Sequence, residues 1–304
     1  MSEPRTVLVT GATGLVGRRL VPALHAAGFS VRAVTRNPAR AGLPAGVETV
    51  EWNGRTVTQE MLFRTHGVVH LSGEPVFGGR LTAGRKRRIL DSRVASTRAI
   101  VESIAALPQA DRPSCLVCAS AVGYYGDRGD EPLTESAAAG SGFLAEVCEA
   151  WEAAAAECEP LGVRRASLRI GVVLAREGGA LATMRLPFSF GVGGRFGDGK
   201  QWFPWIHIDD LVSLLVAAVS DERYRGTLNA VAPNPVTNAE LTTELGLRLR
   251  RPTFFTVPAL AAKLALGELS DELLASRRAV PEAARDLGFE FRYPELGDAL
   301  AAEL

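Results

Sequence analysis

Short apolar runs alternate with amphipathic helical periods along the first 174 residues of the chain. Strands are expected at Thr6–Val9, Val31–Val34, Val47–Trp52, Gly67–Leu71, Ser114–Ala119 and Arg165–Ile170. Helices, with apolar residues three and four positions apart, are expected at Leu15–Ala27, Arg85–Leu107 and Phe143–Cys158. Apolar strands that alternate with such helices are typical of a parallel sheet covered on both faces. The pattern therefore predicts an α/β fold.

The pattern changes after Leu174. Residues 178–199 are rich in glycine and are expected to be irregular, and a short strand, Trp205–Ile208, then leads into a helix, Asp209–Val219. From residue 235 onward, helical segments are separated by prolines. We therefore expect one domain from residues 1–174, to which residues 205–234 return. Residues 175–204 and 235–304 are expected to form a small, mostly helical C-terminal lobe on the substrate side.

Composition narrows the classes of partner. Lys plus Arg and Asp plus Glu each number 34, so the formal net charge is zero and supports neither a nucleic-acid nor a polybasic membrane partner. No stretch of about eighteen apolar residues occurs, so no transmembrane helix is expected. The four histidines show no metal-ligand spacing, and no metal site is predicted.

The chain has four cysteines, from which the redox state of its cellular compartment can be inferred: Cys115, Cys118, Cys148 and Cys158. The first two form a C-x-x-C motif inside a predicted strand, where side chains three positions apart point to opposite faces. Buried free thiols are therefore favoured over a redox pair. This usage indicates a reducing, cytoplasmic setting.

The strongest motif is Gly-Ala-Thr-Gly-Leu-Val-Gly, residues 11–17, between the first strand and the first helix. Gly11 permits a tight turn, Gly14 lets the backbone approach a pyrophosphate, and Gly17 lets helix and strand pack closely. The helix start then faces the phosphates with its amides and its dipole. This context predicts dinucleotide binding by a Rossmann-type doubly wound sheet, with contacts from Gly11, Thr13, Gly14, Leu15, Val16 and Gly17.

The end of the second strand indicates which dinucleotide binds. NAD enzymes carry an acidic residue there for the ribose hydroxyls, but this chain has Thr35 and Arg36. A guanidinium suits a 2′-phosphate and stacks on adenine, and the Thr35 hydroxyl adds a hydrogen bond. NADP(H) is therefore favoured over NAD. The alternative, that Arg36 is a solvated surface charge, leaves the missing acid unexplained.

The fourth strand runs into a segment that is expected to pass the cofactor: Leu71, Ser72, Gly73 and Glu74. Small residues here let the cofactor lie against backbone, and Glu74 is either a partner for a cofactor hydroxyl or an exposed loop acid. The basic run at residues 85–88 is expected to be a solvated helix face. Farther along the same helix, Arg93 is our choice for an arginine that holds a phosphate at the mouth of the site.

Several motifs carry a resemblance to a known family. The segment V-T-G-A-T-G-L-V-G at residues 9–17 resembles the extended branch of the short-chain dehydrogenase/reductase superfamily. S-A-V-G-Y-Y-G at 120–126, L-R-I-G-V-V-L at 168–174 and W-I-H-I-D-D-L at 205–211 resemble later elements of that branch. With its C-terminal tail of the DUF1731 type, the chain is identified as a member of the atypical YfcH-like epimerase-family group, in the NAD-dependent epimerase/dehydratase superfamily.

The resemblance implies a catalytic serine or threonine and a Tyr-x-x-x-Lys pair on the following helix. Ser120 matches the first, but Phe143 stands where the tyrosine is expected and Val147 where the lysine is. A phenyl ring transfers no proton. We therefore expect Ser120 to polarise the substrate oxygen, and Tyr124, Tyr125 or water to handle the proton. The alternative for Tyr125 is a packing aromatic with a satisfied hydroxyl.

Two further segments have open roles. In residues 193–204, the chain offers two cations, an amide and two aromatics that either form a substrate wall or close the domain interface: Arg195, Lys200, Gln201, Trp202 and Phe203. At the W-I-H-I-D-D-L element, the resemblance implies an aspartate that caps the following helix. His207 is expected to orient this junction and not to catalyse.

Three functions are weighed. The leading hypothesis is an NADP(H)-dependent oxidoreductase of the atypical extended type, acting on an unknown small carbonyl or alcohol substrate between the lobes. The alternative is a non-catalytic NADP(H)-binding module that senses redox state. A sugar-nucleotide epimerase is a weaker interpretation, because such enzymes normally need the tyrosine and a tightly held NAD. The expected partner is a small molecule, and assembly as a homodimer is left open.

Overall fold

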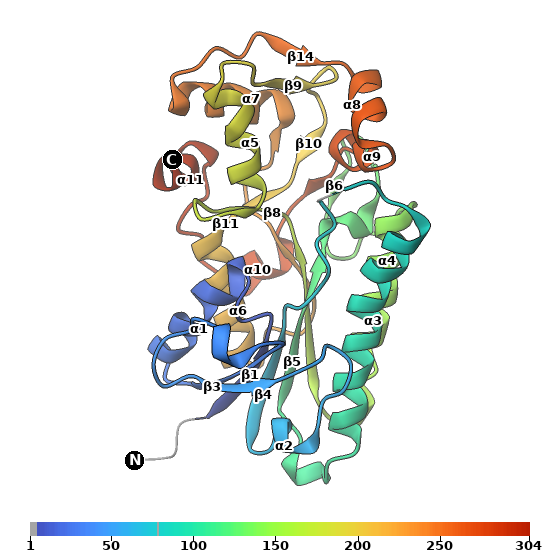
Figure 1. Ribbon diagram of the computed structural model, residues 1–304, viewed down its shortest axis with the longest axis vertical. Coiled ribbons are helices and arrows are strands. Elements are labelled where there is room, and N and C mark those ends of the chain that lie inside the picture. The colour runs from blue at the N-terminus through green and yellow to red at the C-terminus, as the bar shows by residue number, and fades with distance from the viewer. Residues whose placement is uncertain (1–4, 78) are drawn as a thin grey trace.

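Seven parallel strands form the central sheet of the computed structural model, which describes residues 5–77 and 79–304 (Figure 1). The strands are β1 Thr6–Thr10, β2 Ser30–Thr35, β3 Glu48–Glu51, β4 Thr65–His70, β5 Cys115–Ala121, β7 Arg164–Ile170 and β12 Gly226–Ala230. Their order is β12-β7-β5-β4-β1-β2-β3. Chain crossovers on both sides of β1 make the sheet doubly wound, which confirms the predicted fold class.

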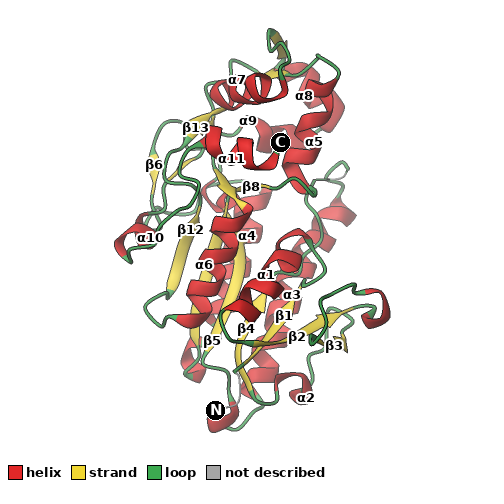
Figure 2. Cartoon of the chain, turned by 90° about the vertical axis from the view of Figure 1, so that its left-hand side faces the viewer, coloured by secondary structure: helices red, strands yellow, loops and turns green. Residues whose placement is uncertain are grey.

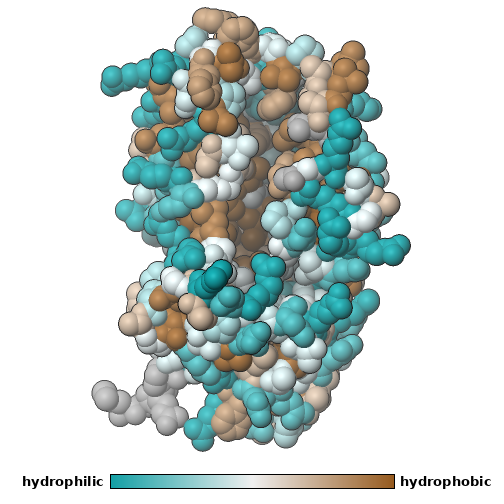
Figure 3. Space-filling view, in the orientation of Figure 1, coloured by the Kyte–Doolittle hydropathy of each residue, from teal (hydrophilic) through white to brown (hydrophobic). Residues whose placement is uncertain are grey.

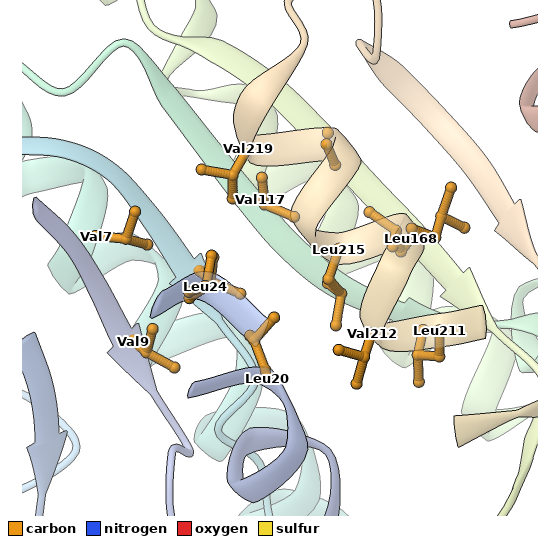
Figure 4. Packing of buried hydrophobic residues seen from close by; sticks show 14 of the residues in the cluster. Val7, Val9, Leu20, Leu24, Val117, Leu168, Leu211, Val212, Leu215 and Val219 are labelled. Atoms are coloured by element: carbon orange, nitrogen blue, oxygen red, sulfur yellow. The ribbon is translucent and has the colours of Figure 1, made fainter. Parts of the chain in front are cut away.

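Helices cover both faces of the sheet. One face packs against α1 (Leu15–Ala26) and α6 (Ile208–Ser220), and Figure 4 shows apolar side chains of these helices directed at β1, β5 and β7. The other face packs against α3 (Ala83–Ala105) and α4 (Phe143–Ala156). Cys115 lies in the first core and Cys118 in the second, so the C-x-x-C side chains point to opposite faces as predicted, and all four cysteines are free and buried.

A smaller lobe lies beyond the carboxyl ends of the strands (Figure 2). Its elements are α5 Gly179–Ser189, β9 Gly194–Phe196, β10 Trp202–Phe203, β13 Val236–Thr237, α7 Asn238–Leu249, β14 Phe255–Val257, α8 Ala259–Leu266, α9 Leu269–Leu274 and α11 Leu296–Glu303. At the junction with the sheet domain, β8 Val172–Leu174 pairs with β11 Trp205–His207. Short elements complete the chain: α2 Gln59–Leu62, β6 Pro132–Leu133, β15 Arg278–Ala279 and α10 Glu282–Asp286.

Two expectations about these elements are corrected. Residues 179–189 form α5 where an irregular segment was expected, because Leu181, Met184 and Phe188 recur at helical spacing and pack into the core of the smaller lobe. The strand β12 was not predicted, since its five residues lack the β-branched run that marks the other strands. It lies at the sheet edge beside β7.

The junction between the lobes is fixed by buried polar groups. His207, and not an aspartate, caps α6: its Nδ1 accepts the N–H of Asp209 at 3.1 Å. Its Nε2 lies 3.1 Å from Glu303, and its ring packs at a tilt against Tyr293, with the ring centroids 3.8 Å apart. Asp210 instead accepts two backbone N–H groups from residues 292 and 293. His207 therefore orients the junction as predicted, while the expected aspartate cap is wrong.

No helix in residues 5–77 or 79–304 is both long enough and apolar enough to cross a membrane.

Candidate functional site

The glycine loop between β1 and α1 has the geometry that its three glycines require. Gly11 has a φ of +70°, and a Cβ there would lie 2.9 Å from the Leu71 carbonyl carbon. A Cβ on Gly17 would lie 2.2 Å from the Gly11 carbonyl oxygen. Gly14 is exposed, and no side chain in the described part of the chain caps α1, so the first amides of the helix remain open. The other predicted residues of the loop are partly exposed beside it: Thr13, Leu15 and Val16.

A basic cavity of about 520 Å³ opens beside this loop, at the end of β2. Its lining contains three arginines and no acid: Thr13, Arg18, Thr35, Arg36, Asn37 and Arg40. Arg18 is held by backbone, since its Nε donates to the Thr13 carbonyl at 3.0 Å and its guanidinium also reaches residues 41 and 42. Arg36 is exposed. A hollow of about 550 Å³ on the outer side of α3 contains none of the predicted site residues.

The sequence analysis brought Thr13, Thr35 and Arg36 to this cavity but missed Arg18, Asn37 and Arg40. The spacing of residues in the sequence could have indicated two of these three, Arg18 and Arg40. Arg18 follows Gly14 by four residues, which is one helical turn, and Arg40 follows Arg36 by four.

A buried polar network fixes the backbone that follows β4. Thr10 Oγ1 accepts the N–H groups of Leu71 and Ser72 at 3.1 and 3.2 Å and lies 2.7 Å from His70 Nδ1. His70 Nε2 lies 3.0 Å from Ser96 Oγ. Burial lowers the pKa of His70 to about 3, so the ring is neutral. With the Thr10 hydroxyl donating to Nδ1 and Nε2–H donating to Ser96, every group in the network has a partner.

Arg93 lies under the same segment. Its Nη1 donates to the Glu74 carbonyl at 3.0 Å, its guanidinium lies 5.2 Å from the Trp151 ring, and a Cβ on Gly73 would lie 3.2 Å from Arg93 Cζ. Burial lowers the pKa of Arg93. The Glu74 carboxylate lies 3.8 Å from Arg88 in a partly exposed pair. Arg93 thus supports the loop, and its predicted contact with a phosphate stays a prediction.

Three adjacent strands present a row of polar side chains at their carboxyl ends. The register places Ser120 of β5 opposite Arg169 of β7, and Arg169 opposite Asn229 of β12. Glu152 of α4 lies over this row: Ser120 Oγ donates to its Oε1 at 2.6 Å, and Arg169 Nε and Nη2 donate to its two oxygens at 2.8 and 2.9 Å. Burial opposes the charge, but the hydrogen bonds that Arg169 donates to Glu152 raise the pKa of Arg169.

The two tyrosines after Ser120 have different surroundings. Tyr125 is fully buried, and its hydroxyl donates to Asn229 Oδ1 at 2.7 Å and accepts from Arg169 at 2.9 Å, which supports the packing role. Burial raises the pKa of Tyr125. Tyr124 is half-buried, and its ring lies 3.4 Å from the Arg169 guanidinium carbon. Within residues 5–77 and 79–304 its hydroxyl bonds no protein group, which leaves Tyr124 as the better placed of the two candidates.

The expected Tyr-x-x-x-Lys positions hold apolar side chains that face different surroundings. Val147 is 2% exposed and lies in the core. Phe143 is half-buried at the start of α4, with Lys86 Nζ 5.3 Å from its ring centroid, and Lys86 pairs with Glu268 of the smaller lobe. The basic run at residues 85–88 is therefore only partly a solvated face.

Glu152 and Arg169 escaped the sequence analysis, although Arg169 lies in a segment quoted for the resemblance and Glu152 in the predicted helix Phe143–Cys158. The pairing of these two side chains depends on the register of the strands, which cannot be read from the sequence.

The segment at residues 193–204 largely closes the interface between the lobes. Trp202 Nε1 donates to Asp130 at 2.8 Å, and its ring lies 4.7 Å from the Arg278 guanidinium carbon. Gln201 donates to the Phe196 carbonyl at 3.1 Å. The cations Arg195 and Lys200 are exposed. Figure 3 shows the hollow between the lobes, with hydrophobic side chains on its floor and hydrophilic ones along its lower rim.

Comparison with known proteins tests the family resemblance drawn from the sequence motifs. The sequence model of the NAD dependent epimerase/dehydratase family matches residues 7–230, and a domain of unknown function, DUF1731, matches residues 257–303. The chain belongs to the NAD dependent epimerase/dehydratase family. This confirms the resemblance drawn from the motifs, including the C-terminal tail.

Relatives of this family cover nearly the whole chain. The Arabidopsis thaliana "Epimerase family protein SDR39U1 homolog, chloroplastic" is 41% identical over 98% of this chain and 86% of its own length. The structure of human epimerase family protein SDR39U1 with NADPH superposes with a TM-score of 0.86 at 32% identity, over 98% of both chains. MoeE5 in complex with UDP-glucose and NAD has a TM-score of 0.78 at 23% identity over 98% and 97%, which supports the fold alone.

Proposed function

We propose that this protein is an NADP(H)-dependent oxidoreductase of the atypical extended short-chain dehydrogenase type, acting on a small alcohol or carbonyl compound. The observation that carries the proposal is the cavity with Arg18, Arg36 and Arg40 and no acid, at the strand end where NAD enzymes place a carboxylate. Three guanidinium groups suit the extra phosphate of NADP(H). The NADPH bound to the human relative is in keeping with this assignment.

The residues at the strand ends fit a dinucleotide. The open amides at the start of α1 and the exposed Gly14 suit a pyrophosphate. Residues Leu71 and Ser72, held by Thr10, offer backbone along its path. When bound, the cofactor supplies a nicotinamide that takes or gives a hydride. Ser120 contacts the substrate oxygen in our proposal, and Tyr124, whose hydroxyl bonds no protein group within residues 5–77 and 79–304, lies near it on the same strand end.

Calorimetric titration with NADPH and NADH tests the cofactor assignment. We expect wild-type protein to prefer NADPH, and Arg36→Ala to weaken NADPH about ten- to a hundredfold, as loss of a charge-assisted contact predicts. NADH affinity should change little. Arg225→Ala is the matched control, because Arg225 is exposed at the opposite edge of the sheet. Equal affinity for NADH and NADPH in the wild type would refute the role given to Arg36.

The second candidate is a non-catalytic NADP(H)-binding module. Phe143 and the buried Val147, at the positions of the missing pair, favour it. A screen of NADP⁺ with alcohols and NADPH with carbonyls separates the two, because a module binds the cofactor and turns over nothing. A sugar-nucleotide epimerase has less support, since no proton-transferring pair stands at these positions. Four free buried thiols fit the cytoplasmic setting that we propose for the chain.

A further inference from the structure

The hydroxyl proton of Ser120 already has an acceptor inside the protein. Ser120 Oγ donates to Glu152 Oε1 at 2.6 Å, and a serine hydroxyl has one proton and two lone pairs. Hydrogen bonds of this length to a carboxylate are among the stronger ones in proteins. A further partner of Ser120 therefore meets lone pairs and not a proton. This reverses the expectation that Ser120 donates to a substrate carbonyl.

The Glu152 carboxylate, which accepts this hydrogen bond, is held in one orientation. Arg169 binds both oxygens of Glu152 side by side, and the two side chains are 4% and 11% exposed. The remaining Arg169 nitrogen, Nη1, donates to Tyr125 at 2.9 Å and to the Glu135 carbonyl at 3.3 Å. Arg169 is thus committed to protein groups, and Ser120 is the member of the network left to meet a substrate.

We propose that Glu152 accepts the proton of the reaction through Ser120, and that the substrate is an alcohol. This inference rests on the NADP(H) function proposed above. The substrate O–H donates to Ser120 Oγ and passes its proton there, while the proton of Ser120 passes to Glu152 Oε1. The hydride of the carbinol carbon leaves for the oxidised nicotinamide, and the C–O bond becomes C=O. The alcohol loses one proton and one hydride, so atoms and electrons balance.

The same arrangement accounts for the missing Tyr-x-x-x-Lys pair. A hydride transfer from an alcohol needs a proton acceptor beside the oxygen. Position 143 offers none, whereas Glu152, nine residues farther along the same helix, reaches the serine directly. Arg169 donates to both oxygens of that carboxylate and holds it beside Ser120. The acceptor has therefore moved along α4 and works through Ser120.

Binding in complexes that cannot react tests the substrate class without turnover. Alcohols are titrated into protein saturated with NADPH, and their carbonyl counterparts into protein saturated with NADP⁺, by saturation-transfer NMR. Benzyl alcohol with benzaldehyde and cyclohexanol with cyclohexanone are the probes. We expect each alcohol to bind about three- to tenfold tighter than its carbonyl counterpart, the value of one hydrogen bond, and Ser120→Ala to abolish the difference.

Turnover tests the role of Glu152. Glu152→Gln should lower the kcat of NADP⁺-driven alcohol oxidation by about 100-fold or more, the usual share of general base catalysis, with unchanged NADPH affinity. Glu152→Asp keeps a carboxylate and should retain part of the activity. Glu149→Gln, on the exposed side of the same helix, is the control. Ser120→Ala leaves the Arg169 ion pair intact and covers the case in which Glu152→Gln does not fold.

Each outcome has a distinct meaning. Failure of the wild type to bind NADPH overturns the proposed function itself. NADPH binding together with tighter binding of the carbonyls, or with an alcohol preference that survives Ser120→Ala, overturns this inference alone. Full alcohol oxidation by Glu152→Gln also overturns it, because the proton would then have another acceptor. Equal losses in Glu152→Gln and Glu152→Asp, with weaker NADPH binding in both, assign Glu152 a structural role instead.

Discussion

Replacing Arg169 with methionine should destabilise the protein more than removing both members of its ion pair. The side chains of Arg169 and Glu152 are 4% and 11% exposed, so Arg169→Met leaves a carboxylate in a nearly dry site with Ser120 as its remaining partner. Removing one member of a buried pair costs about 3–5 kcal/mol. Replacing both members by apolar groups, as in Arg169→Met with Glu152→Leu, leaves no uncompensated charge and should cost less than the single change.

Urea unfolding at pH 7, followed by tryptophan fluorescence, measures these differences. The control is Arg248→Met, which breaks the pair with Glu244 on α7, where the side chains are 39% and 25% exposed. That pair is largely screened by solvent, and its loss should cost less than about 1 kcal/mol. The reasoning is refuted if Arg169→Met costs no more than the control, or if the double variant is less stable than Arg169→Met.

Three further predictions concern the cofactor loop, pH and the thiols. Gly17→Ala should weaken NADPH at least about tenfold, because its Cβ would lie 2.2 Å from the Gly11 carbonyl, whereas Gly84→Ala, with open space around it, should change nothing in the same titration. His70 has a folded pKa of about 3 and an ordinary value of 6.5, so its contribution to stability is present above pH 6.5. Below that pH the unfolded state binds a proton that the folded state does not, and up to about 1.4 kcal/mol is lost per pH unit. Urea unfolding between pH 7 and 4 should show the free energy of unfolding falling with this slope. In His70→Asn the unfolded state should bind about one proton fewer relative to the folded state, so the slope should be smaller. Burial raises the pKa of Cys118 to about 12 and of Cys148 to about 11, so a thiol reagent at pH 8 should label neither until urea is added; rapid labelling of the folded protein would contradict their burial.

The local pattern of apolar and polar residues predicts most strands and helices of the sheet domain, and the strand that it misses has a local cause. Six of the seven sheet strands were predicted from their apolar and β-branched positions. The inner strands β1 and β5 are apolar along most of their length because both of their faces are buried. The exception, β12, has Asn229 as the fourth of its five residues, a residue type that is typical of turns. Its burial makes sense only once Tyr125 and the carbonyls of Leu133 and Val280 are known to bond it.

The cofactor half of the site was predictable for a similar reason. A glycine loop between strand and helix is contiguous in sequence, and Gly11, Gly14 and Gly17 each answer a local steric demand. The arginine cavity was only half found, since Arg18 comes from α1 and Arg36 from the end of β2. Pairing these residues requires knowing that α1 begins, and β2 ends, at the same edge of the sheet.

The proposed catalytic half of the site depends on the register of the strands, which no local sequence signal fixes. Ser120, Arg169 and Asn229 lie on three strands far apart in sequence, and they share a face because the β5–β7–β12 ladders place them opposite one another. A slip of one residue in either ladder would turn Arg169 to the other face of the sheet, away from Glu152. The ion pair itself opposes such a slip, because an unpaired Arg169 would be buried among the apolar residues of the opposite core. In this site, the groups proposed to move the proton also hold the strands in register, so stability and turnover should respond to the same substitutions, and only Ser120→Ala, which leaves the ion pair intact, separates them.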